Sequence, residues 1–320
     1  MQLSAGGARP ADGFRHEAFL YAGPQEFVAG AVPFIEDGLA AGEPVLVAVP
    51  APRIELLRDT LGAAAESVDF VDKTHLGRNP ARMIPAWREF VGSANGHGVR
   101  GIGEPIWAER SDIEVVECQH HETLLNLAFA DSPPWTLLCP YDIETLSSDV
   151  IEEAQRSHPF VLHHGQQRES GQFHGIDGSS VLEGPLPEPS GYARELWFDI
   201  TMLGEVRSFV AREAAKAGLG IMEAGDLVLA VNEIVTNSVI HASGRGQLRI
   251  WRDARRVVCE IRDDGTISEP LVGRELPMIE DEGGRGLWLA NQLCDLVQIR
   301  SFAGVTVVRL HLELDGARVA

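Results

Sequence analysis

The sequence predicts a layered α/β domain followed by a separate α+β domain. The chain has 320 residues, which suits two domains of the usual ~100–200 residues. Residues 165–191 are rich in glycine and proline and show little apolar periodicity, which predicts a linker. Before this stretch, short apolar runs alternate with helical patterns, and after it neighbouring strands are joined by short turns. The first pattern favours a parallel sheet covered by helices, and the second favours antiparallel pairing with helices on one face.

The first domain, residues 14–164, opens with a strand, a helix and a second strand. Between the first two apolar runs, Phe27, Ala31, Ile35 and Leu39 recur at helical spacing, and Gly42 ends that helix. The expected strands are short apolar runs, which cover residues 18–21, 44–49, 68–71, 99–104 and 135–141. The expected helices cover residues 24–41, 83–92 and 113–130.

The second domain, residues 192–320, has a different order of elements. The expected strands cover residues 195–200, 248–252, 257–262, 296–301 and 305–312. The expected helices cover residues 203–217, 223–242 and 287–293. Between the expected strand at residues 257–262 and the expected helix at residues 287–293, residues 265–283 are polar and irregular, which predicts a long loop.

Composition excludes several classes of function. Hydrophobic residues make up 44% and charged residues 23%, as in ordinary globular proteins. The net charge of −20 argues against a nonspecific nucleic-acid surface, which needs clustered Lys and Arg. No apolar run approaches the ~18 residues of a membrane span, and the first residues lack a signal-peptide pattern. The four cysteines form no Cys-x-x-Cys pair, so a reduced, cytoplasmic protein is expected.

One helix of the second domain carries a polar stripe. In LAVNEIVTNSVIHA, residues 229–242, Glu233, Asn237 and His241 follow one another at intervals of four, which places them on one side of the helix. A carboxylate and a carboxamide one turn apart suit hydroxyl activation and coordination of Mg²⁺ with phosphate. The alternative is a solvated face with an ordinary hydrogen bond along the helix.

Three weaker signals follow this helix. The segment IRDDGTI, residues 261–267, ends a strand in a carboxylate at a turn, although Asp-Gly is also a common turn pair. The segment GGRGL, residues 283–287, opens a helix after glycines, which lets backbone N–H groups approach an anion or simply serves as a hinge. Thr306 stands among apolar residues of a strand, where a backbone hydrogen bond would satisfy it.

The order and spacing of these segments resemble the GHKL superfamily of gyrase- and histidine-kinase-type ATPases. More closely, they resemble the anti-sigma-factor serine kinases, over residues 195–312. The resemblance implies the α+β sandwich called the Bergerat fold, with ATP and Mg²⁺ as cofactors. It implies that Glu233 orients or deprotonates the attacking hydroxyl and that Asn237 binds the Mg²⁺ that bridges the phosphates. The other residues that it places at the nucleotide are Asp263, Gly265 and Thr306 at adenine, and Gly284, Arg285 and Gly286 at the phosphates.

The sequence also departs from that family. Ile267 stands where the family often has a second glycine, which predicts a less open loop beside adenine. The expected ATP lid, residues 269–282, is short and acidic, so its carboxylates are expected to face solvent. Because the motif region has no lysine, neutralisation of the phosphates would depend on Mg²⁺ and Arg285.

Histidine-kinase chemistry is a weaker alternative. A sensor histidine kinase needs an acceptor histidine on a dimerising helical hairpin just before the ATPase domain. Here that place is taken by the Gly- and Pro-rich linker, and no long amphipathic helix follows His158, His163 or His164. The sequence therefore favours an ATPase domain that acts on, or holds, another protein.

The first domain resembles the MEDS sensory domain, of the methanogen, methylotroph and dichloromethane-regulator type. The segments that carry the resemblance are FRHEAFLYAGPQEF, GEPVLVAV, GIGEPIW, VVECQHHETLLNLAF and LLCPYD. That family implies a degenerate RecA/KaiC-like α/β unit. A working P-loop needs a Gly-Lys-Ser/Thr ending, whereas the first turn reads AGPQEFVAG and neither Lys73 nor Lys216 lies in such a context. We therefore expect no ATP hydrolysis by a P-loop.

A group of side chains in the first domain invites a metal interpretation. On the helix predicted at residues 113–130, Cys118 and His121 are three residues apart, and Glu117 and His121 are four apart. The neighbours that could join them, along the helix or in space, are His120, Glu122, Cys139 and His16. Tetrahedral zinc needs three or four converging ligands. A buried cysteine beside solvated histidines is the favoured alternative.

The two resemblances together imply a cytoplasmic two-domain switch in signal transduction and transcription regulation. The first domain would sense a small molecule or a protein state. The second would bind Mg²⁺–ATP and control a sigma factor, by sequestration or as a serine/threonine-protein kinase acting on its antagonist. The implied partners are a sigma factor or a STAS-type anti-anti-sigma protein, with no direct nucleic-acid or membrane contact, and a homodimer is compatible with them. The rivals are a nucleotide-gated scaffold without kinase activity and a histidine kinase without a standard acceptor domain.

Overall fold

The computed structural model describes residues 13–76, 78–94, 96, 98–175, 179–189, 191–277 and 284–314. The chain divides into two compact units. Unit 1 comprises Met1–Gly77 and Ala86–Asp177, and unit 2 comprises Arg78–Pro85 and Gly178–Ala320. Each unit has its own sheet and its own buried core.

Unit 1 is built on a seven-stranded sheet with the order β3-β2-β4-β5-β1-β6-β7. Its strands are β1 Phe14–Tyr21, β2 Val45–Val49, β3 Asp69–Asp72, β4 Val99–Gly103, β5 Trp135–Asp142, β6 Phe160–His163 and β7 Gln166–Glu169. All pairs are parallel except β6 with β7. The expected α/β sheet is confirmed, but β6 and β7 lie where the sequence predicted no strand, and β7 falls within the stretch 165–191.

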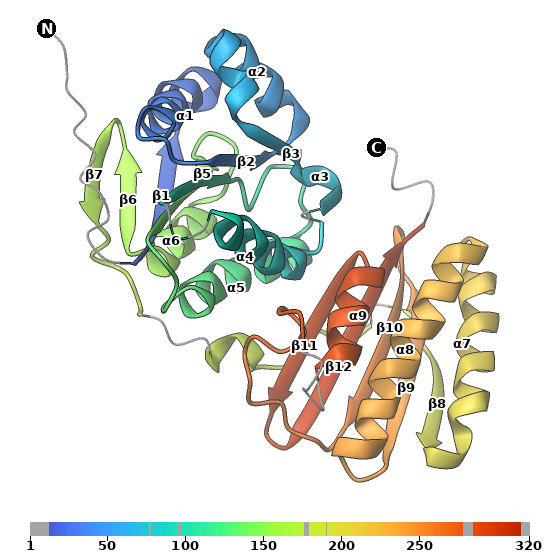
Figure 1. Ribbon diagram of the computed structural model, residues 1–320. Coiled ribbons are helices and arrows are strands. Elements are labelled where there is room, and N and C mark those ends of the chain that lie inside the picture. The colour runs from blue at the N-terminus through green and yellow to red at the C-terminus, as the bar shows by residue number, and fades with distance from the viewer. Residues whose placement is uncertain are drawn as a thin grey trace, which may run out of the picture. The chain divides into compact units, whose positions relative to one another are not determined.

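Helices cover both faces of this sheet (Figure 1). One face carries α1 Gly23–Ala40 and α2 Ala51–Leu61, and the other carries α4 Met83–Ser93, α5 Asp112–Ala128 and α6 Ser148–Ser157. The short helix α3, Lys73–Leu76, follows β3. Short 3₁₀ helices occupy Gly62–Ser67, Pro80–Arg82, Ser179–Leu182 and Ile200–Met202. A parallel sheet covered on both sides is the arrangement expected from strand–helix–strand connections.

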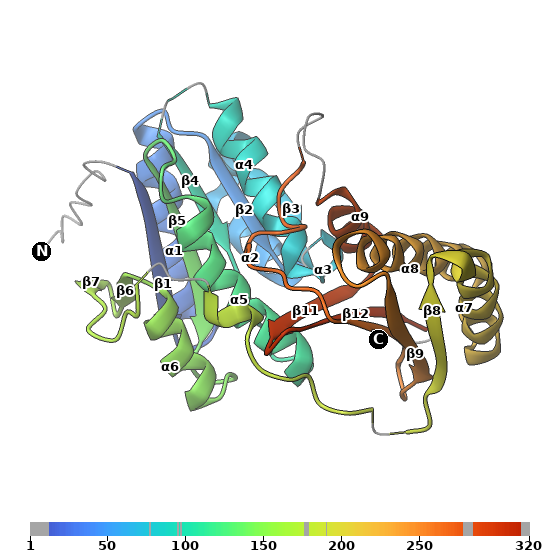
Figure 2. The same cartoon turned by 90° about the horizontal axis from the view of Figure 1, so that it is seen from below.

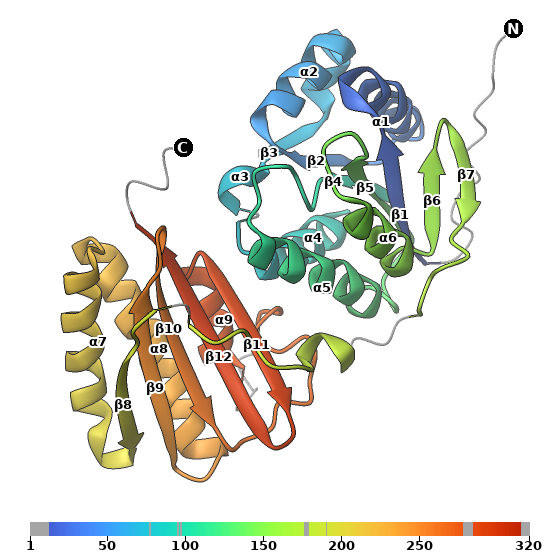
Figure 3. The same ribbon diagram turned by 180° about the vertical axis from the view of Figure 1, so that it is seen from behind.

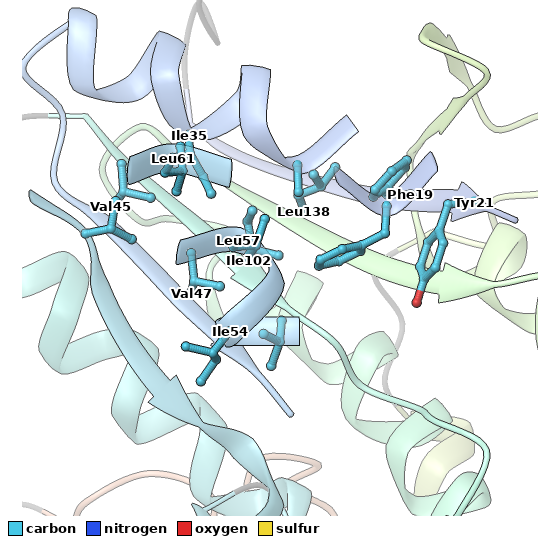
Figure 4. Packing of buried hydrophobic residues seen from close by; sticks show 14 residues of the cluster. Phe19, Tyr21, Ile35, Val45, Val47, Ile54, Leu57, Leu61, Ile102 and Leu138 are labelled. Atoms are coloured by element: carbon cyan, nitrogen blue, oxygen red, sulfur yellow. The ribbon is translucent and has the colours of Figure 1, made fainter. Parts of the chain in front are cut away.

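The alternation of side chains along the strands sorts residues to the two faces. Val47, Ile102 and Leu138 are neighbours in register and face α1 and α2, where they form an apolar cluster (Figure 4). Their neighbours along the strands face the other side, where a Cβ added to Gly101 would approach the Trp87 ring to 2.9 Å. Because Gly101 has no side chain, α4 can lie close to the sheet on that face.

Unit 2 is built on a five-stranded antiparallel sheet with the order β11-β12-β10-β9-β8. Its strands are β8 Arg194–Asp199, β9 Arg245–Arg252, β10 Arg256–Asp263, β11 Leu296–Phe302 and β12 Val305–Glu313. The helices α7 Leu203–Ala217, α8 Ile221–His241 and α9 Arg285–Leu293 lie on one face (Figure 2). The expected α+β layers are confirmed, with strand and helix ends within a few residues of the predicted ones.

Helix α8 is the central helix of unit 2. It has 21 residues, and its buried stripe of Leu227, Ala230, Val231, Ile234 and Val235 packs on the sheet. Although α8 is long, its acidic residues break the apolar surface, and none of the described helices has the length and apolarity to cross a membrane.

The face of the unit 2 sheet opposite the helices is covered by the chain segment before β8 (Figure 3). On that face the buried Glu260 accepts hydrogen bonds from the guanidinium groups of Arg249 and Arg309, its neighbours in register on β9 and β12. Arg249 also pairs with Glu188 at 2.7 Å, and Arg309 donates to the carbonyl of Pro187 at 2.9 Å. Part of the stretch expected to be a linker is therefore tied to the sheet.

Candidate functional site

A cavity of about 330 Å³ opens in unit 2 between α8, the loop after β10, the start of α9 and β12. Five of the residues that the resemblance places at the nucleotide line it, namely Asn237, Asp263, Gly265, Gly284 and Thr306, and so does His241 of the polar stripe. A larger hollow of about 770 Å³ beside β8 and α7 is lined mostly by charged side chains and contains none of them. The smaller cavity is therefore the candidate site, because residues distant in sequence converge on it.

Asp263, the last residue of β10, is held by two hydrogen-bond donors. Its Oδ2 accepts from the hydroxyl of Ser238 on α8 at 2.5 Å, and its Oδ1 accepts from the backbone N–H of Gly265 at 2.8 Å. A carboxylate offers about four lone-pair directions. Asp263 is thus fixed in orientation and still able to accept a hydrogen bond from a ligand in the cavity.

Gly265 shapes the turn beside Asp263. A Cβ at Gly265 would lie 2.9 Å from Asp263 Oδ1 and 3.2 Å from Ala242 Cβ, so a side chain there would disturb the carboxylate. The carbonyl of Gly265 accepts the hydroxyl proton of the buried Thr306 at 3.0 Å. Thr306 therefore holds the backbone of the turn. Its hydroxyl proton is donated to Gly265 and is not available to a ligand.

Ser301 completes this network from β11. Its hydroxyl lies 3.0 Å from Thr306 Oγ1 and accepts the backbone N–H of Ile267 at 2.8 Å. Since Thr306 donates to Gly265, Ser301 must be the donor between the two hydroxyls. Ile267, which replaces the expected second glycine, is thus tied to the end of the β11–β12 hairpin and lines the cavity.

Glu233 and Asn237 lie on α8 against the first turn of α9. A Cβ at Gly286 would approach Asn237 Nδ2 to 3.0 Å and Glu233 Cβ to 3.1 Å. Gly284, with φ of 85°, is in the left-handed region and caps the start of α9. The glycines therefore bring the N-terminal backbone N–H groups of α9 next to the polar stripe of α8, where an anion would be favoured.

The described part of the expected lid is anchored on α9. Gly273 has φ of 71°, and its carbonyl accepts from the amide of the buried Asn291 at 2.9 Å. Glu269 is exposed at the rim of the cavity, as expected for an acidic lid residue. Arg285 is exposed at the start of α9. The lid residues Glu280, Asp281 and Glu282, and Gly283 after them, lie outside the described residues.

The apolar and polar groups that line the cavity fit a nucleotide with its metal ion. Ile234, Leu287 and Val308 give the cavity apolar walls beside the Asp263 carboxylate, which suits a flat base that offers an amino group. The oxygen of the Asn237 carboxamide is of the type that Mg²⁺ prefers, and Mg²⁺ usually keeps waters and phosphate oxygens as its other ligands. His241 is exposed at the edge of the cavity.

Sequence reasoning missed two residues of this site, Ser238 and Ser301. Ser238 belongs to the buried stripe of α8, where a lone hydroxyl among apolar residues needs a partner. Ser301 faces Thr306 in the register of the β11–β12 hairpin. Both residues could have been inferred from the sequence. Ser238 follows from the helical period of α8, and Ser301 follows from its pairing with Thr306 across the short turn at residues 303–304.

In unit 1 the structure gathers some of the suspected metal ligands and not others. Single ligand atoms of His16, Glu122, Cys139 and His158 all lie within 4.8 Å of one another. Within the described part of the chain, this is the group of such side chains that could hold a metal, and neither Cys118 nor His121 belongs to it. From the sequence, His158 was weighed only as a candidate phosphate acceptor, whereas its side chain is fully buried.

Family comparisons agree with the two resemblances. Residues 15–159 match the family model described as the methanogen/methylotroph, DcmR sensory domain (MEDS). Residues 196–312 match the family model described as histidine kinase-like ATPase domain. The chain therefore combines a MEDS domain with a following histidine kinase-like ATPase domain, as the sequence motifs predict. No curated protein matches the chain.

One solved structure with partial similarity contains the RsbU and RsbW domains of Rv1364c from Mycobacterium tuberculosis. The two share 21% sequence identity with a TM-score of 0.30, over 39% of this chain and 32% of that one. The chain thus spans about a third of the length of that protein. A likeness of this size assigns neither fold nor function.

Proposed function

We propose that unit 2 binds ATP with Mg²⁺ in the cavity beside Asp263 and thereby controls a sigma factor. Control would take the form of sequestration, or of phosphorylation of a serine or threonine on the antagonist of that factor. The observation that carries the proposal is the Asp263 carboxylate, oriented by two donors at an apolar cavity of about 330 Å³. The match to a histidine kinase-like ATPase domain supports the nucleotide, and the sequence resemblance to anti-sigma serine kinases supports the partner.

Adenine recognition would depend on Asp263 and the turn after it. The carboxylate would accept a hydrogen bond from the adenine amino group. Gly265 leaves room for the base, and Thr306 holds the turn in place through the Gly265 carbonyl. A charged acceptor contributes more to binding than a neutral one, because charge-assisted hydrogen bonds are worth ~1.5–3 kcal/mol.

The phosphates would lie between α8 and the first turn of α9. Asn237 would hold Mg²⁺ through its carboxamide oxygen, and the N–H groups around Gly284 and Gly286 would face the phosphates. Arg285 would add positive charge at the rim. Mg²⁺, when bound, supplies the charge neutralisation that phosphoryl transfer requires.

Glu233 would act one helical turn before Asn237. From there it would orient the hydroxyl of the acceptor protein towards the terminal phosphate and take up its proton. Phosphoryl transfer requires little covalent help from the protein, so positioning and electrostatics would do most of the work. Glu233 is half-buried against Gly286, which limits its freedom to turn away from that place.

Unit 1 would be the sensor of this switch. We assign the sensory domain to residues 14–164, the linker to residues 165–191 and the ATPase domain to residues 192–320. The RecA/KaiC-like ancestry of the first domain and a cytoplasmic location belong to the same proposal. The four cysteines are free and buried, as suits a reducing compartment.

The decisive experiment incubates the full chain with Mg²⁺–[γ-³²P]ATP and a candidate STAS-type antagonist. Label on a serine or threonine of the antagonist supports the kinase. ATP-dependent capture of a sigma factor without label supports the nucleotide-gated scaffold. Acid-labile, base-stable label on the chain itself would instead indicate a histidine kinase, and absence of ATP binding would refute the proposal as a whole.

A further inference from the structure

We infer that unit 1 contains a closed tetrahedral site for a divalent transition metal of the zinc class, with His16, Glu122, Cys139 and His158 as ligands. The inference is independent of the ATP site in unit 2. The four residues come from four elements: His16 from β1, Glu122 from α5, Cys139 from β5, and His158 from the end of α6. All four are buried, with exposed fractions between 0 and 2%.

The spacing of the four ligand atoms suits a tetrahedral ion. Glu122 Oε2 lies 3.1 Å from His158 Nε2 and 3.3 Å from His16 Nε2, and Cys139 Sγ lies 3.4 Å from His16 Nε2. Zinc bonds of ~2.0–2.3 Å in a tetrahedron place neighbouring ligand atoms about 3.4 Å apart. Small side-chain adjustments would therefore be enough to bring all four atoms to bonding distance of one ion.

The protonation of His16 is set by Asn126. The side-chain amide nitrogen of Asn126 donates to the carbonyl of Ser157 at 2.7 Å and to that of Glu122 at 3.3 Å. Its Oδ1 must then be the atom that faces His16 Nδ1, at 3.1 Å. The His16 Nδ1 therefore carries a hydrogen, and in the neutral ring Nε2 has a free lone pair.

The protonation of His158 is set by the backbone. Its Nδ1 lies 2.7 Å from the carbonyl oxygen of Ala154, which can only accept. The Nδ1 is thus the donor, and Nε2 of the neutral ring again has a free lone pair. Support of one ring nitrogen by a carbonyl or amide oxygen, with the other nitrogen free, is the arrangement found around metal-bound histidines.

The centre of the cluster consequently has few hydrogen-bond donors. Two imidazole lone pairs and a carboxylate oxygen point at one another, and only the Cys139 thiol brings a proton. Outside the cluster itself, neither His158 Nε2 nor Glu122 Oε2 has a hydrogen-bond partner among the described residues. Buried polar atoms are rarely left in this state, and a cation among them would satisfy all four at once.

Charge balance also fits a divalent ion. A carboxylate from Glu122 and a thiolate from Cys139 carry two negative charges, and neutral imidazoles add none, so the occupied site would be neutral. Binding of the ion by the Cys139 thiolate would release the thiol proton to solvent.

The ligand set selects the class of metal. Two nitrogens, one sulfur and one carboxylate oxygen suit zinc and its borderline neighbours rather than Mg²⁺ or Ca²⁺, which prefer oxygen alone. Because the protein supplies all four positions, the site is of the closed, structural type. Its effect would be to hold β1, β5, α5 and α6 together at the centre of the sensory unit.

The test uses the full chain, stripped of metal by a chelator and then titrated with Zn²⁺ against a chromophoric competitor. We expect one tight Zn²⁺ site per chain. Cys139→Ser should weaken it by roughly a hundredfold or more, whereas the control Cys118→Ser, a buried cysteine of the same unit outside the cluster, should leave it unchanged. Co²⁺ as a probe should give a thiolate charge-transfer band in the native chain and in Cys118→Ser.

Several outcomes would overturn the inference. These are a native chain that binds no stoichiometric Zn²⁺, a Co²⁺ complex without the thiolate band, and equal loss of binding in the Cys118→Ser control. If Cys139→Ser does not fold, the Co²⁺ spectrum of the native chain and Zn²⁺ titration of Glu122→Gln still decide the matter. A charged His158–Glu122 pair in place of a metal site predicts equal, weak Zn²⁺ binding by the native chain and Glu122→Gln. None of these measurements depends on ATP.

Discussion

Unit 1 and unit 2 each place polar side chains beside a sheet, but they satisfy them in opposite ways. In unit 1, His16, Glu122, Cys139 and His158 are closed off between a parallel sheet and the helices on one of its faces. In unit 2, Asp263 is half-buried at a cavity, with N–H and O–H donors already on it. The closed cluster has fewer hydrogen-bond donors than acceptors. In the open site, Asp263 has two donors in place and still has lone pairs for a ligand.

The difference follows from the two architectures. Both faces of a parallel sheet covered by helices are shielded from water, so a polar group buried there needs a partner inside the fold. The antiparallel sheet of unit 2 carries its helices on one face, and the irregular loop after β10 leaves a mouth beside α8. A closed site suits a permanent ion, whereas an open site suits a ligand that is exchanged.

The largest effect is expected from Glu233→Ala in the open site. Loss of a positioned base should lower phosphoryl transfer by roughly 10²–10⁴-fold. ATP affinity should stay near that of the native chain, because Glu233 is not assigned to nucleotide or metal. Calorimetry for ATP and ³²P transfer to the antagonist measure the two quantities separately.

Asn237→Ala is the matched variant one turn further along α8. It should lose Mg²⁺-dependent binding, so ATP affinity with and without Mg²⁺ should become similar. The contrast between the two variants identifies chemistry at one position and metal binding at the other. Full transfer activity in both would remove the kinase assignment.

The next effect concerns the closed interior of unit 1. Glu104 is buried, and its Oε1 accepts from the Tyr21 hydroxyl at 3.0 Å. Burial raises the pKa of Glu104 to about 7 from its usual 4.5. The folded state therefore favours the protonated acid, and its contribution to stability is full below pH ~4.5 and is lost as the pH rises towards 7.

This difference corresponds to about 3 kcal/mol of free energy of unfolding between pH 4.5 and 7. Glu104→Gln keeps the neutral form at every pH, so it should flatten that part of the stability profile of unit 1. Chemical denaturation at a series of pH values from 4.5 to 8 measures the slope. A variant with the native slope would show that Glu104 is charged in the fold and that the interior of unit 1 is less closed than we describe.

Asp263→Asn tests the carboxylate of the open site. Replacing a charged acceptor by a neutral amide should cost ~1.5–3 kcal/mol, which is roughly ten- to a hundredfold in ATP affinity. The control is Asp264→Asn, because Asp264 is exposed and accepts from the backbone N–H of Ser243 instead. Calorimetric titration that finds native affinity in a folded Asp263→Asn chain would remove Asp263 from the site.

Much of the fold was predictable because it depends on local periodicity. The helix predicted at residues 203–217 coincides with α7, and its end is fixed by Gly218 with φ of 100°. Strand β7 was not predictable, since QQRE has no apolar residue and its pairing with β6 supplies the only reason for it to be extended. Short polar edge strands give no pattern of their own.

The same distinction between local pattern and tertiary packing applies to the residues of the two sites. Asn237, Asp263 and Thr306 could be grouped beforehand because their order along the chain carried a family resemblance, and the structure brings them to one cavity. The fourth member of the unit 1 cluster, His158, could not, because only the crossing of α6 over the sheet brings it to Glu122. Residues that meet only through tertiary packing have no characteristic spacing in the sequence.

The smallest effect is expected from Ser238→Ala, a change at one of the two site residues that sequence reasoning missed. Its hydroxyl donates to Asp263 Oδ2 at 2.5 Å, so its loss leaves the carboxylate with the Gly265 N–H alone. One hydrogen bond of ~0.5–1.5 kcal/mol predicts ATP affinity roughly two- to tenfold lower. Thr236→Ala is the matched control, since that hydroxyl on the same helix donates to the carbonyl of Asn232 at 2.7 Å and does not reach the site. Calorimetry should also find that Ser238→Ala has little further effect in the Asp263→Asn background, because both act on one contact with adenine. Additive losses would mean that Ser238 acts elsewhere, and the open site would then not depend on a carboxylate oriented from α8.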